Sequence, residues 1–381
     1  SGSTRIPMEL LGVVLLLVAA MLLEGWLYSR YGLRHLQYRC YFQQKEVPEG
    51  SVLELVEELE NQKFLPLPWL KAELTLPKWL EVSGAHTVQT GEVQVLTSIF
   101  AVKSYSQVRR TWQVRANKRG TYSIEHALLM TANLLGNTRQ SMRVEDRGNP
   151  ILVLPIPYEQ AAPVWQQLLA FGDAQTLQRR GLPDPFYSAG VRPYQAGDAW
   201  NRIHWNATAK AQRLMVRQEL YTAVPSIRIL LNLQTDPDSA SRNVWYADRL
   251  EHSIRVALRC VQEALLQGIS VQLWVNGCIS GAESPYSVIM LTRMAQEPEL
   301  RRFLARLEDP PTQSLSQFLQ EVPPCGMHEA QICITPYTTK ELQAWRRRQR
   351  MSRILVTARG MDPLGLADAV LPLAERKEAD R

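Results

Sequence analysis

The chain has 381 residues, of which 45% are hydrophobic and 21% are charged, and it carries a net charge of +6. This length is enough for two ordinary domains, and the composition excludes an intrinsically disordered chain. The basic excess permits contact with anionic lipid or nucleic acid but requires neither. Because no zinc-finger, ribonucleoprotein or basic-arm pattern is present, we expect no nucleic-acid partner.

The 5 cysteines are scattered and form no C-x-x-C pair. An odd number at such spacings favours free thiols in a reducing compartment over a disulfide framework or a structural zinc site.

The N-terminal segment has the composition of a membrane anchor. Residues 1–3 (SGS) are typical of an expression scar, and residues 6–28 form an apolar run of about the length that a helix needs to cross a bilayer. Near its end lie three aromatic residues typical of a membrane interface, Trp26, Tyr28 and Tyr31. A cleaved signal peptide is disfavoured because no small-residue cleavage site follows, and a buried core helix because the centre of the run is uncharged.

The charges that flank this run predict its orientation. Arg5 precedes the run, and four basic residues follow it. These four are Arg30, Arg34, Arg39 and Lys45. The positive-inside rule then predicts a single-pass protein of the cell membrane, with its N-terminus outside and its C-terminal body in the cytoplasm.

Residues 36–156 show short β-type runs that are separated by turn residues such as Gly50, Gly91 and Gly120. Six or more short strands over this length predict an antiparallel, immunoglobulin-like β-sandwich, although the Cys–Trp–Cys pattern of antibody domains is missing. Such a sandwich has no intrinsic chemistry, and its usual use is spacing or binding.

After a connector at 157–225, residues 226–373 alternate apolar strands with amphipathic helices, and a charged tail follows at 374–381. This alternation predicts a doubly wound α/β domain with a parallel sheet, in which ligands normally bind beyond the carboxyl ends of the strands. The loop after the first strand, NLQTDPDSASRN, contains no glycine, so it is no phosphate-cradling turn, and we expect no nucleotide or other cofactor.

The connector contains the stretch RPYQAGDAWNRIHWNATAKAQRLMVR, residues 192–217, which we call the signature. It resembles the motif of the domain of unknown function 58 family. The positions that carry this resemblance are Arg192, Tyr194, Gly197, Asp198, Arg202, Ile203, Trp205, Leu214, Val216 and Arg217. The resemblance extends over nearly the whole chain. It implies a membrane anchor, a β-sandwich and a von Willebrand factor A-like domain, although members more often carry two membrane helices than one.

A von Willebrand-like fold raises the possibility of a metal site. Metal-binding members carry D-x-S-x-S after the first strand, whose oxygens hold Mg²⁺. This chain has Asn232, Gln234 and Asp236 at those positions, and Pro336 where a later aspartate is expected. With most anionic ligands gone, we expect a degenerate site that binds no metal, and Asp236 to serve in a turn or a helix cap.

The signature itself allows two interpretations. In the first, Asp198 and His204 form an acid/base pair and Arg202 steadies an anion, as in a hydrolase. In the second, Asp198 caps the following short helix, Ile203 and Trp205 pack inward, and the arginines bind that carboxylate or backbone carbonyls. Those arginines are Arg192, Arg202 and Arg217. We favour the second interpretation, a structural junction or a docking site for a partner, because the known hydrolase motifs are missing.

A second basic cluster precedes the last strand and consists of Arg346, Arg347, Arg348, Arg350 and Arg353. Positive charge suits the C-terminal end of a helix, but five arginines exceed that need. We favour a solvated face over contact with anionic lipid or an acidic partner.

The sequence therefore predicts a membrane-anchored, cytoplasmic interaction protein without catalytic activity. The family resemblance implies a protein partner, because members commonly accompany MoxR-type AAA+ ATPases in bacterial operons, and an adaptor role follows from it. Two alternatives remain: a hydrolase that uses Asp198, Arg202 and His204, and a metal-dependent, adhesion-type ligand binder.

Overall fold

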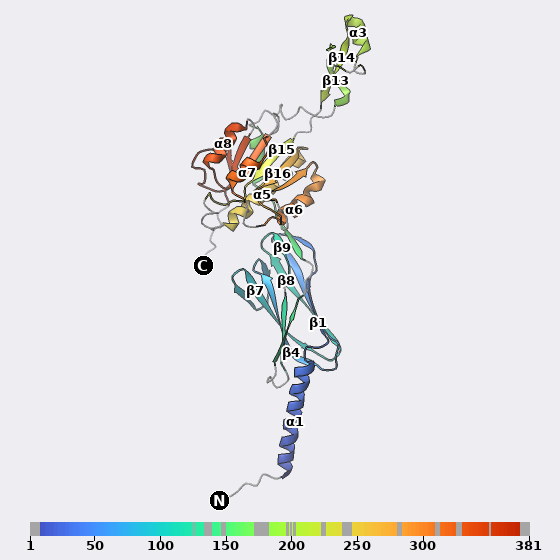
Figure 1. Cartoon of the computed structure of the whole chain (residues 1–381), viewed down its shortest axis with the longest axis vertical. Coiled ribbons are helices and arrows are strands. Elements are labelled where there is room, and N and C mark those ends of the chain that lie inside the picture. The colour runs from blue at the N-terminus through green and yellow to red at the C-terminus, as the bar shows by residue number, and fades with distance from the viewer. Residues whose placement is uncertain are drawn as a thin grey trace. The chain divides into compact units, whose positions relative to one another are not determined.

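The computed structural model describes residues 8–124, 126–132, 139–145, 150–170, 183–195, 198, 200, 203–221, 226–237, 246–279, 284–308, 313–324, 330–349 and 352–373 (Figure 1). The chain divides into two compact units, Ser1–Pro155 and Ile156–Arg381, and each is taken by itself below.

The first unit begins with the helix α1 (Met8–Tyr31). Within it, Gly12–Tyr31 is the one stretch of the described chain that is helical, long and apolar enough to cross a membrane. Its side chains are mostly exposed, as expected of a helix whose apolar surface is covered by something other than the rest of this chain.

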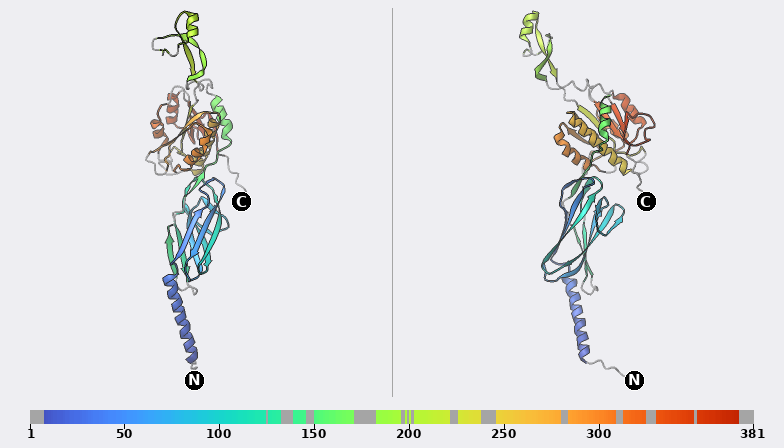
Figure 2. Two further views of the ribbon diagram at one scale, coloured as in Figure 1. Left: turned by 90° about the vertical axis from the view of Figure 1, so that its right-hand side faces the viewer. Right: turned by 180° about the vertical axis from the view of Figure 1, so that it is seen from behind.

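Three antiparallel or mixed sheets follow α1, and two of them face each other (Figure 2). The first has the order β1 (Leu36–Phe42), β3 (Val52–Asn61), β8 (Ser106–Ala116) and β5 (Leu80–Val82). The second has the order β11 (Arg139–Val144), β10 (Ala127–Ala132), β4 (Leu67–Pro77), β7 (Val93–Val102) and β6 (Thr87–Thr90). A small third sheet joins β2 (Glu46–Pro48), β12 (Ile151–Leu154) and β9 (Gly120–Tyr122).

Alternation of apolar and polar residues builds the core between the two main sheets. Leu53, Leu55 and Leu59 of β3 are fully buried and share one apolar cluster with Leu70 and Leu74 of β4. A period of two turns every second side chain to the same face, so the apolar set of each strand points inward. The predicted β-sandwich is confirmed.

One charged residue lies inside that core. Glu57 of β3 is fully buried, and its carboxylate accepts hydrogen bonds from Tyr38 Oη, Ser98 Oγ and Trp112 Nε1, each at 2.6 Å. These donors stand on β1, β7 and β8, so one carboxylate connects both sheets.

The second unit contains a six-stranded sheet in the order β17 (Ser287–Leu291), β16 (Ser270–Val275), β15 (Ser226–Leu231), β18 (Ala330–Thr335), β19 (Ser352–Val356) and β20 (Ala369–Val370). All neighbours are parallel except β16 and β17. From β15 the chain passes to β16 on one side and later to β18 on the other, so the connections run in both directions.

Helices cover both faces of this sheet. On one face, α2 (Ala161–Ala170), α5 (Ala247–Leu266) and α6 (Glu297–Ala305) bury the cluster that contains Ile229 and Leu231. On the other, α7 (Leu315–Glu321) and α8 (Lys340–Arg348) pack on Leu230. A strand covered on both faces is apolar at nearly every position, and this accounts for the sequence SIRILLNLQ. A short 3₁₀ helix, η2 (Met294–Gln296), precedes α6.

The signature lies in a separate two-stranded sheet of the second unit. Here β13 (Pro183–Pro193) pairs antiparallel with β14 (Met215–Tyr221), and the short helix α3 (Trp205–Ala211) lies between them in the chain.

Candidate functional site

Backbone pairing folds the signature back on itself. Arg192 pairs with Val216, and Ile203 forms a further bridge to Val216. The backbone N–H of Tyr194 donates to Leu214 O and that of His204 donates to Met215 O, both at 2.8 Å. Residues that precede α3 are thereby held against the residues that follow it, at the start of β14.

A bidentate ion pair closes the turn after β13. The Arg192 guanidinium donates from Nη1 to Asp198 Oδ2 at 2.8 Å and from Nη2 to Asp198 Oδ1 at 2.6 Å. Asp198 Oδ2 also accepts from the backbone N–H of Gln195 at 2.8 Å. The hydrogen bond to Asp198 raises the pKa of Arg192. This carboxylate is bound in the fork geometry typical of structural Arg–carboxylate pairs, which is the pairing expected for Arg192.

His204 serves as the cap of α3. Its Nδ1 accepts a hydrogen bond from the backbone N–H of Ala207 at 3.2 Å, which satisfies one of the free donors at the helix N-terminus. A ring nitrogen that accepts carries no proton, so the other nitrogen, Nε2, holds it in the neutral form. The cap of α3 is thus His204, while Asp198 binds Gln195 and Arg192.

Trp205 does not pack inward, contrary to the prediction. It is 64% exposed, whereas its neighbour Ile203 is buried. The physical reason is that α3, the 7-residue helix that begins at Trp205, buries none of its residues, so no core covers the indole ring. Trp200 is 68% exposed as well, and its ring lies 6.1 Å from that of Tyr194. Two large aromatic side chains of the signature thus face outward.

Other residues of the predicted site lie outside the described residues. These are Gly197, Arg202 and Arg350, together with the predicted scar at 1–3 and tail at 374–381. Of Arg217 the structure describes the backbone, which pairs with Val191.

The predicted degenerate metal positions take part in a buried amide network at the carboxyl ends of the central strands. Asn232 Oδ1 accepts from Asn276 Nδ2 at 2.6 Å and from the backbone N–H of Gln234 at 3.0 Å. Asn232 Nδ2 donates to Thr335 Oγ1 at 3.0 Å, and Thr335 Oγ1 donates to Tyr337 O at 2.9 Å. Asn276 Oδ1 accepts from the backbone N–H of Leu233 at 2.6 Å. The three side chains that connect β15, β16 and β18 are fully buried.

Gln234 extends this network to the next helix. Its Oε1 accepts from the backbone N–H of Leu315, the first residue of α7, at 2.9 Å. Its Nε2 donates to the carbonyls of Asp236 and Pro237, each at 3.1 Å. Among the described residues, no group of three or more histidine, cysteine, aspartate or glutamate side chains lies close enough to hold a metal ion. The side-chain oxygens of Asn232 and Gln234 are engaged by donors of the protein itself.

Sequence reasoning did not identify Asn276 and Thr335. Their positions carried the signal, because each follows or ends a strand that neighbours β15. Parallel strands present their carboxyl ends at one edge, so polar residues at those ends meet.

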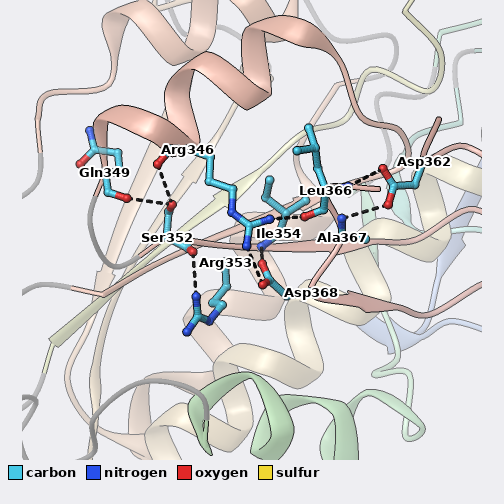
Figure 3. A network of polar contacts seen from close by, with 9 residues as sticks. All are labelled: Arg346, Gln349, Ser352, Arg353, Ile354, Asp362, Leu366, Ala367 and Asp368. Atoms are coloured by element: carbon cyan, nitrogen blue, oxygen red, sulfur yellow. Dashed lines mark hydrogen bonds and ion pairs between the residues drawn. The ribbon is translucent and has the colours of Figure 1, made fainter. Parts of the chain in front are cut away.

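The arginine cluster separates into different roles (Figure 3). Arg346 Nη2 pairs with Asp368 Oδ1 at 2.8 Å, and Nη1 donates to Leu366 O. Asp368 Oδ2 accepts from the backbone N–H of Ile354 at 2.8 Å. Arg346 therefore joins α8 to the segment before β20, and the prediction of a solvated face fails for this residue. Arg347 and Arg348 are exposed, and the half-buried Arg353 donates to Ser352 O at 3.4 Å.

No family model matches the sequence, and no curated protein matches it. Solved structures resemble parts of it weakly. A non-cellulosomal cohesin from the archaeon Archaeoglobus fulgidus is 14% identical, with 28% of this chain and 90% of that chain covered and a TM-score of 0.20.

Two further structures are similar to the same limited extent. The CARDB domain of a Pyrococcus furiosus protein, solved with di-metal ions, is 9% identical over 30% of this chain and 90% of that chain, with a TM-score of 0.19. A cohesin module of a Clostridium perfringens family 33 glycoside hydrolase is 13% identical over 30% and 96%, with a TM-score of 0.19. Likenesses this weak assign neither fold nor function.

Proposed function

We propose that this chain is a membrane-anchored, cytoplasmic, non-enzymatic interaction protein that acts as an adaptor or substrate receptor for a MoxR-type AAA+ ATPase. The observation that carries the proposal is that different side chains of the signature have different roles. Arg192, Asp198 and His204 support the local backbone, while Trp200 and Trp205 face outward.

Exposed tryptophans at fixed positions suit protein recognition. Tryptophan is enriched among the residues that dominate binding energy at interfaces, because a large rigid ring buries much apolar area at little entropic cost. The ion pair between Arg192 and Asp198 and the cap of His204 on α3 fix the backbone from which both rings project. The signature therefore supports docking better than it supports acid/base catalysis, since Asp198 and His204 are each engaged in local structure.

The partner class comes from the resemblance to the domain of unknown function 58 family. That family also implies a von Willebrand factor A-like domain, and the order of the six-stranded sheet with helices on both faces supports this assignment. The closed amide network at its strand ends supports a domain that recognises its partner without a metal-bridged carboxylate.

Anchoring by α1 is part of the same proposal. The helix has the length and the apolar surface that a bilayer requires, and the basic residues after it favour a cytoplasmic body.

The test measures binding between the full chain in lipid nanodiscs and the ATPase, in the ATP-like and the ADP state. Trp200→Ala and Trp205→Ala are each expected to weaken binding by on the order of tenfold or more. Val88→Ala is the matched control, because Val88 is also exposed, at 66%, and belongs to the first unit. Absence of binding in both nucleotide states, or equal affinity of the tryptophan variants and the wild type, would overturn the proposal.

A further inference from the structure

Two loops lie at one end of the sandwich, and the first of them holds the end of α1. Residues 62–66 connect β3 to β4, and residues 103–105 connect β7 to β8; we call them the proximal loops. Lys63 Nζ donates to Gly32 O at 2.8 Å and to Arg34 O at 2.9 Å, just beyond the last turn of the helix. Tyr28, in that last turn, is buried and donates from Oη to Pro66 O at 2.9 Å. The helix therefore continues into the sandwich through specific contacts and not through a loose linker (Figures 1 and 2).

The proximal loops are also fixed to each other. The buried amide of Asn61 donates to Leu65 O at 3.0 Å and to Lys103 O at 2.9 Å. The backbone N–H of Tyr105 donates to Lys63 O at 3.2 Å, and Ser104 Oγ donates to Phe64 O. Both loop tips thus have defined backbone positions.

On this framework stand two aromatic side chains that face away from the protein. Phe64 is 80% exposed and Tyr105 is 70% exposed, the two highest fractions among the large hydrophobic side chains of the described residues. Tyr105 has a φ of 49°, in the left-handed region that costs free energy for a residue other than glycine. An aromatic ring held outward on such a backbone contributes little to the fold itself.

The adjoining end of α1 carries the same kind of residue. The rings of Trp26 and Tyr31 lie 6.2 Å apart, and the Arg34 guanidinium lies over the Tyr31 ring at 5.5 Å. Aromatic rings with an apolar body and a polar edge favour the boundary between lipid chains and headgroups, and nearby cations attract anionic headgroups. One end of the first unit thus combines aromatic and basic groups around the end of an apolar helix.

We propose that the proximal loops insert Phe64 and Tyr105 into the headgroup layer of the bilayer that α1 spans, so that the sandwich contacts lipid directly. The inference rests on the proposed anchoring of α1. The occupant is lipid because the surface is continuous with the apolar helix: the 20 residues of Gly12–Tyr31 span about 30 Å, the thickness of the hydrocarbon core, and end beside these loops. Three fixed points, α1 and two loop tips, then set the orientation of the sandwich on the membrane.

The experiment places an environment-sensitive fluorescent amino acid at one position of the full chain, reconstituted into phosphatidylcholine vesicles that contain some phosphatidylglycerol. The four positions are Leu16, Phe64, Tyr105 and, as the exposed control near the far end of the sandwich, Val88. Quenching by lipids brominated near the headgroup reports contact at the interface, and quenching by deeply brominated lipids reports insertion of α1.

We expect deep quenching at Leu16, interfacial quenching at Phe64 and Tyr105, and quenching by aqueous iodide alone at Val88. If Leu16 is quenched from the lipid and positions 64 and 105 behave like position 88, the lipid contact is refuted while the anchor stands, and these rings belong to a protein interface. If Leu16 itself is open to iodide, the anchoring proposal fails, and the lipid contact fails with it. Circular dichroism of each labelled chain checks that the fold is retained.

Discussion

Replacing Asn232 by aspartate tests whether the strand-end network is closed. The change is nearly isosteric, and it turns one amide of the network into a carboxylate, the group that binds Mg²⁺ in proteins. Oδ1 keeps its donors, Asn276 Nδ2 and the backbone N–H of Gln234. The second oxygen now faces Thr335 Oγ1, which must give up its hydrogen bond to Tyr337 O in order to donate to it.

The magnitude follows from burial. Asn232 is fully buried, so an ionised carboxylate there loses its hydration, at an effective cost of several kcal/mol. Its two donors offset part of that cost, and the lost hydrogen bond to Tyr337 adds about 1 kcal/mol. We expect the second unit of Asn232→Asp to lose about 3–5 kcal/mol of unfolding free energy at neutral pH, or roughly 10 °C in melting temperature.

The pH dependence has a definite sign. Burial raises the pKa of the introduced carboxyl above the value of about 3.9 in the unfolded chain. The folded state therefore takes up the proton first as the pH falls. The loss of unfolding free energy relative to the wild type is therefore complete above the raised pKa. It shrinks as the pH falls through that pKa, because the protonated carboxyl can donate to Thr335 as the amide did.

The assay is differential scanning calorimetry of the full chain in detergent, with and without Mg²⁺, from neutral to mildly acidic pH. Asn206→Asp is the matched control, since the same chemical change on the exposed face of α3 should leave the melting temperature unaltered. An Asn232→Asp variant as stable as the wild type at neutral pH would refute the reasoning, because the strand ends would then accommodate a buried charge. Stabilisation of the variant by Mg²⁺ would also refute it, because the strand ends would then bind a metal ion.

Three further predictions address other parts of the fold. Glu57→Leu should lower the unfolding free energy of the sandwich by about 3–5 kcal/mol, because three donors lose their acceptor. Glu57→Gln should lower it by about half of that, because the Tyr38 hydroxyl can turn to accept from the new amide. Urea titration measures both losses. Asp368→Ala should cost about 2 kcal/mol by removing the acceptor of Arg346 and Ile354 N–H, and exposed Arg347→Ala almost nothing in the same titration. Burial lowers the pKa of Lys63 to about 8, so between about pH 8 and 10 the unfolded chain binds one proton more than the folded chain. The melting temperature of the wild type should therefore rise over this range relative to that of Lys63→Met. Melting temperatures that change in parallel for the two proteins would contradict the lowered pKa of Lys63.

Periodicity was sufficient to predict much of the fold. The apolar run at the N-terminus, the alternation in strands such as β3 and the turn glycines depend on local pattern, and the helix and the sandwich follow from them. The sequence could not settle which strands pair across the sheets, because pairing depends on contacts between residues far apart in the chain. The edge strand β17 has only 5 residues and is only partly buried, so its pattern in the sequence is weak.

The candidate site shows where residue type misleads. Trp205 looked like a core residue because tryptophan is apolar, but burial requires a surface packed against the ring. The 7-residue helix α3, which begins at Trp205, buries none of its residues. Aspartate is a strong helix capper, but the cap position of α3 belongs to His204 and not to Asp198. The nearer His204 supplied the acceptor, and Arg192 took the carboxylate in a pair with two parallel hydrogen bonds. The partner of Asp198 and the exposure of Trp205 thus depended on residues elsewhere in the signature and on the length of α3. The preferences of single residue types do not encode either.

The amide side chains at the strand ends and the tryptophans of the signature together define the kind of recognition open to this chain. An asparagine is neutral at every pH and both donates and accepts, so Asn232 and Asn276 satisfy each other without a counter-ion. A carboxylate in the same place would be a buried charge with no counter-ion among these side chains, and it would lower the stability of the domain. With the edge satisfied internally, the proposed docking draws its binding energy from surfaces that the fold leaves uncovered, and the exposed rings of Trp200 and Trp205 supply apolar area of that kind.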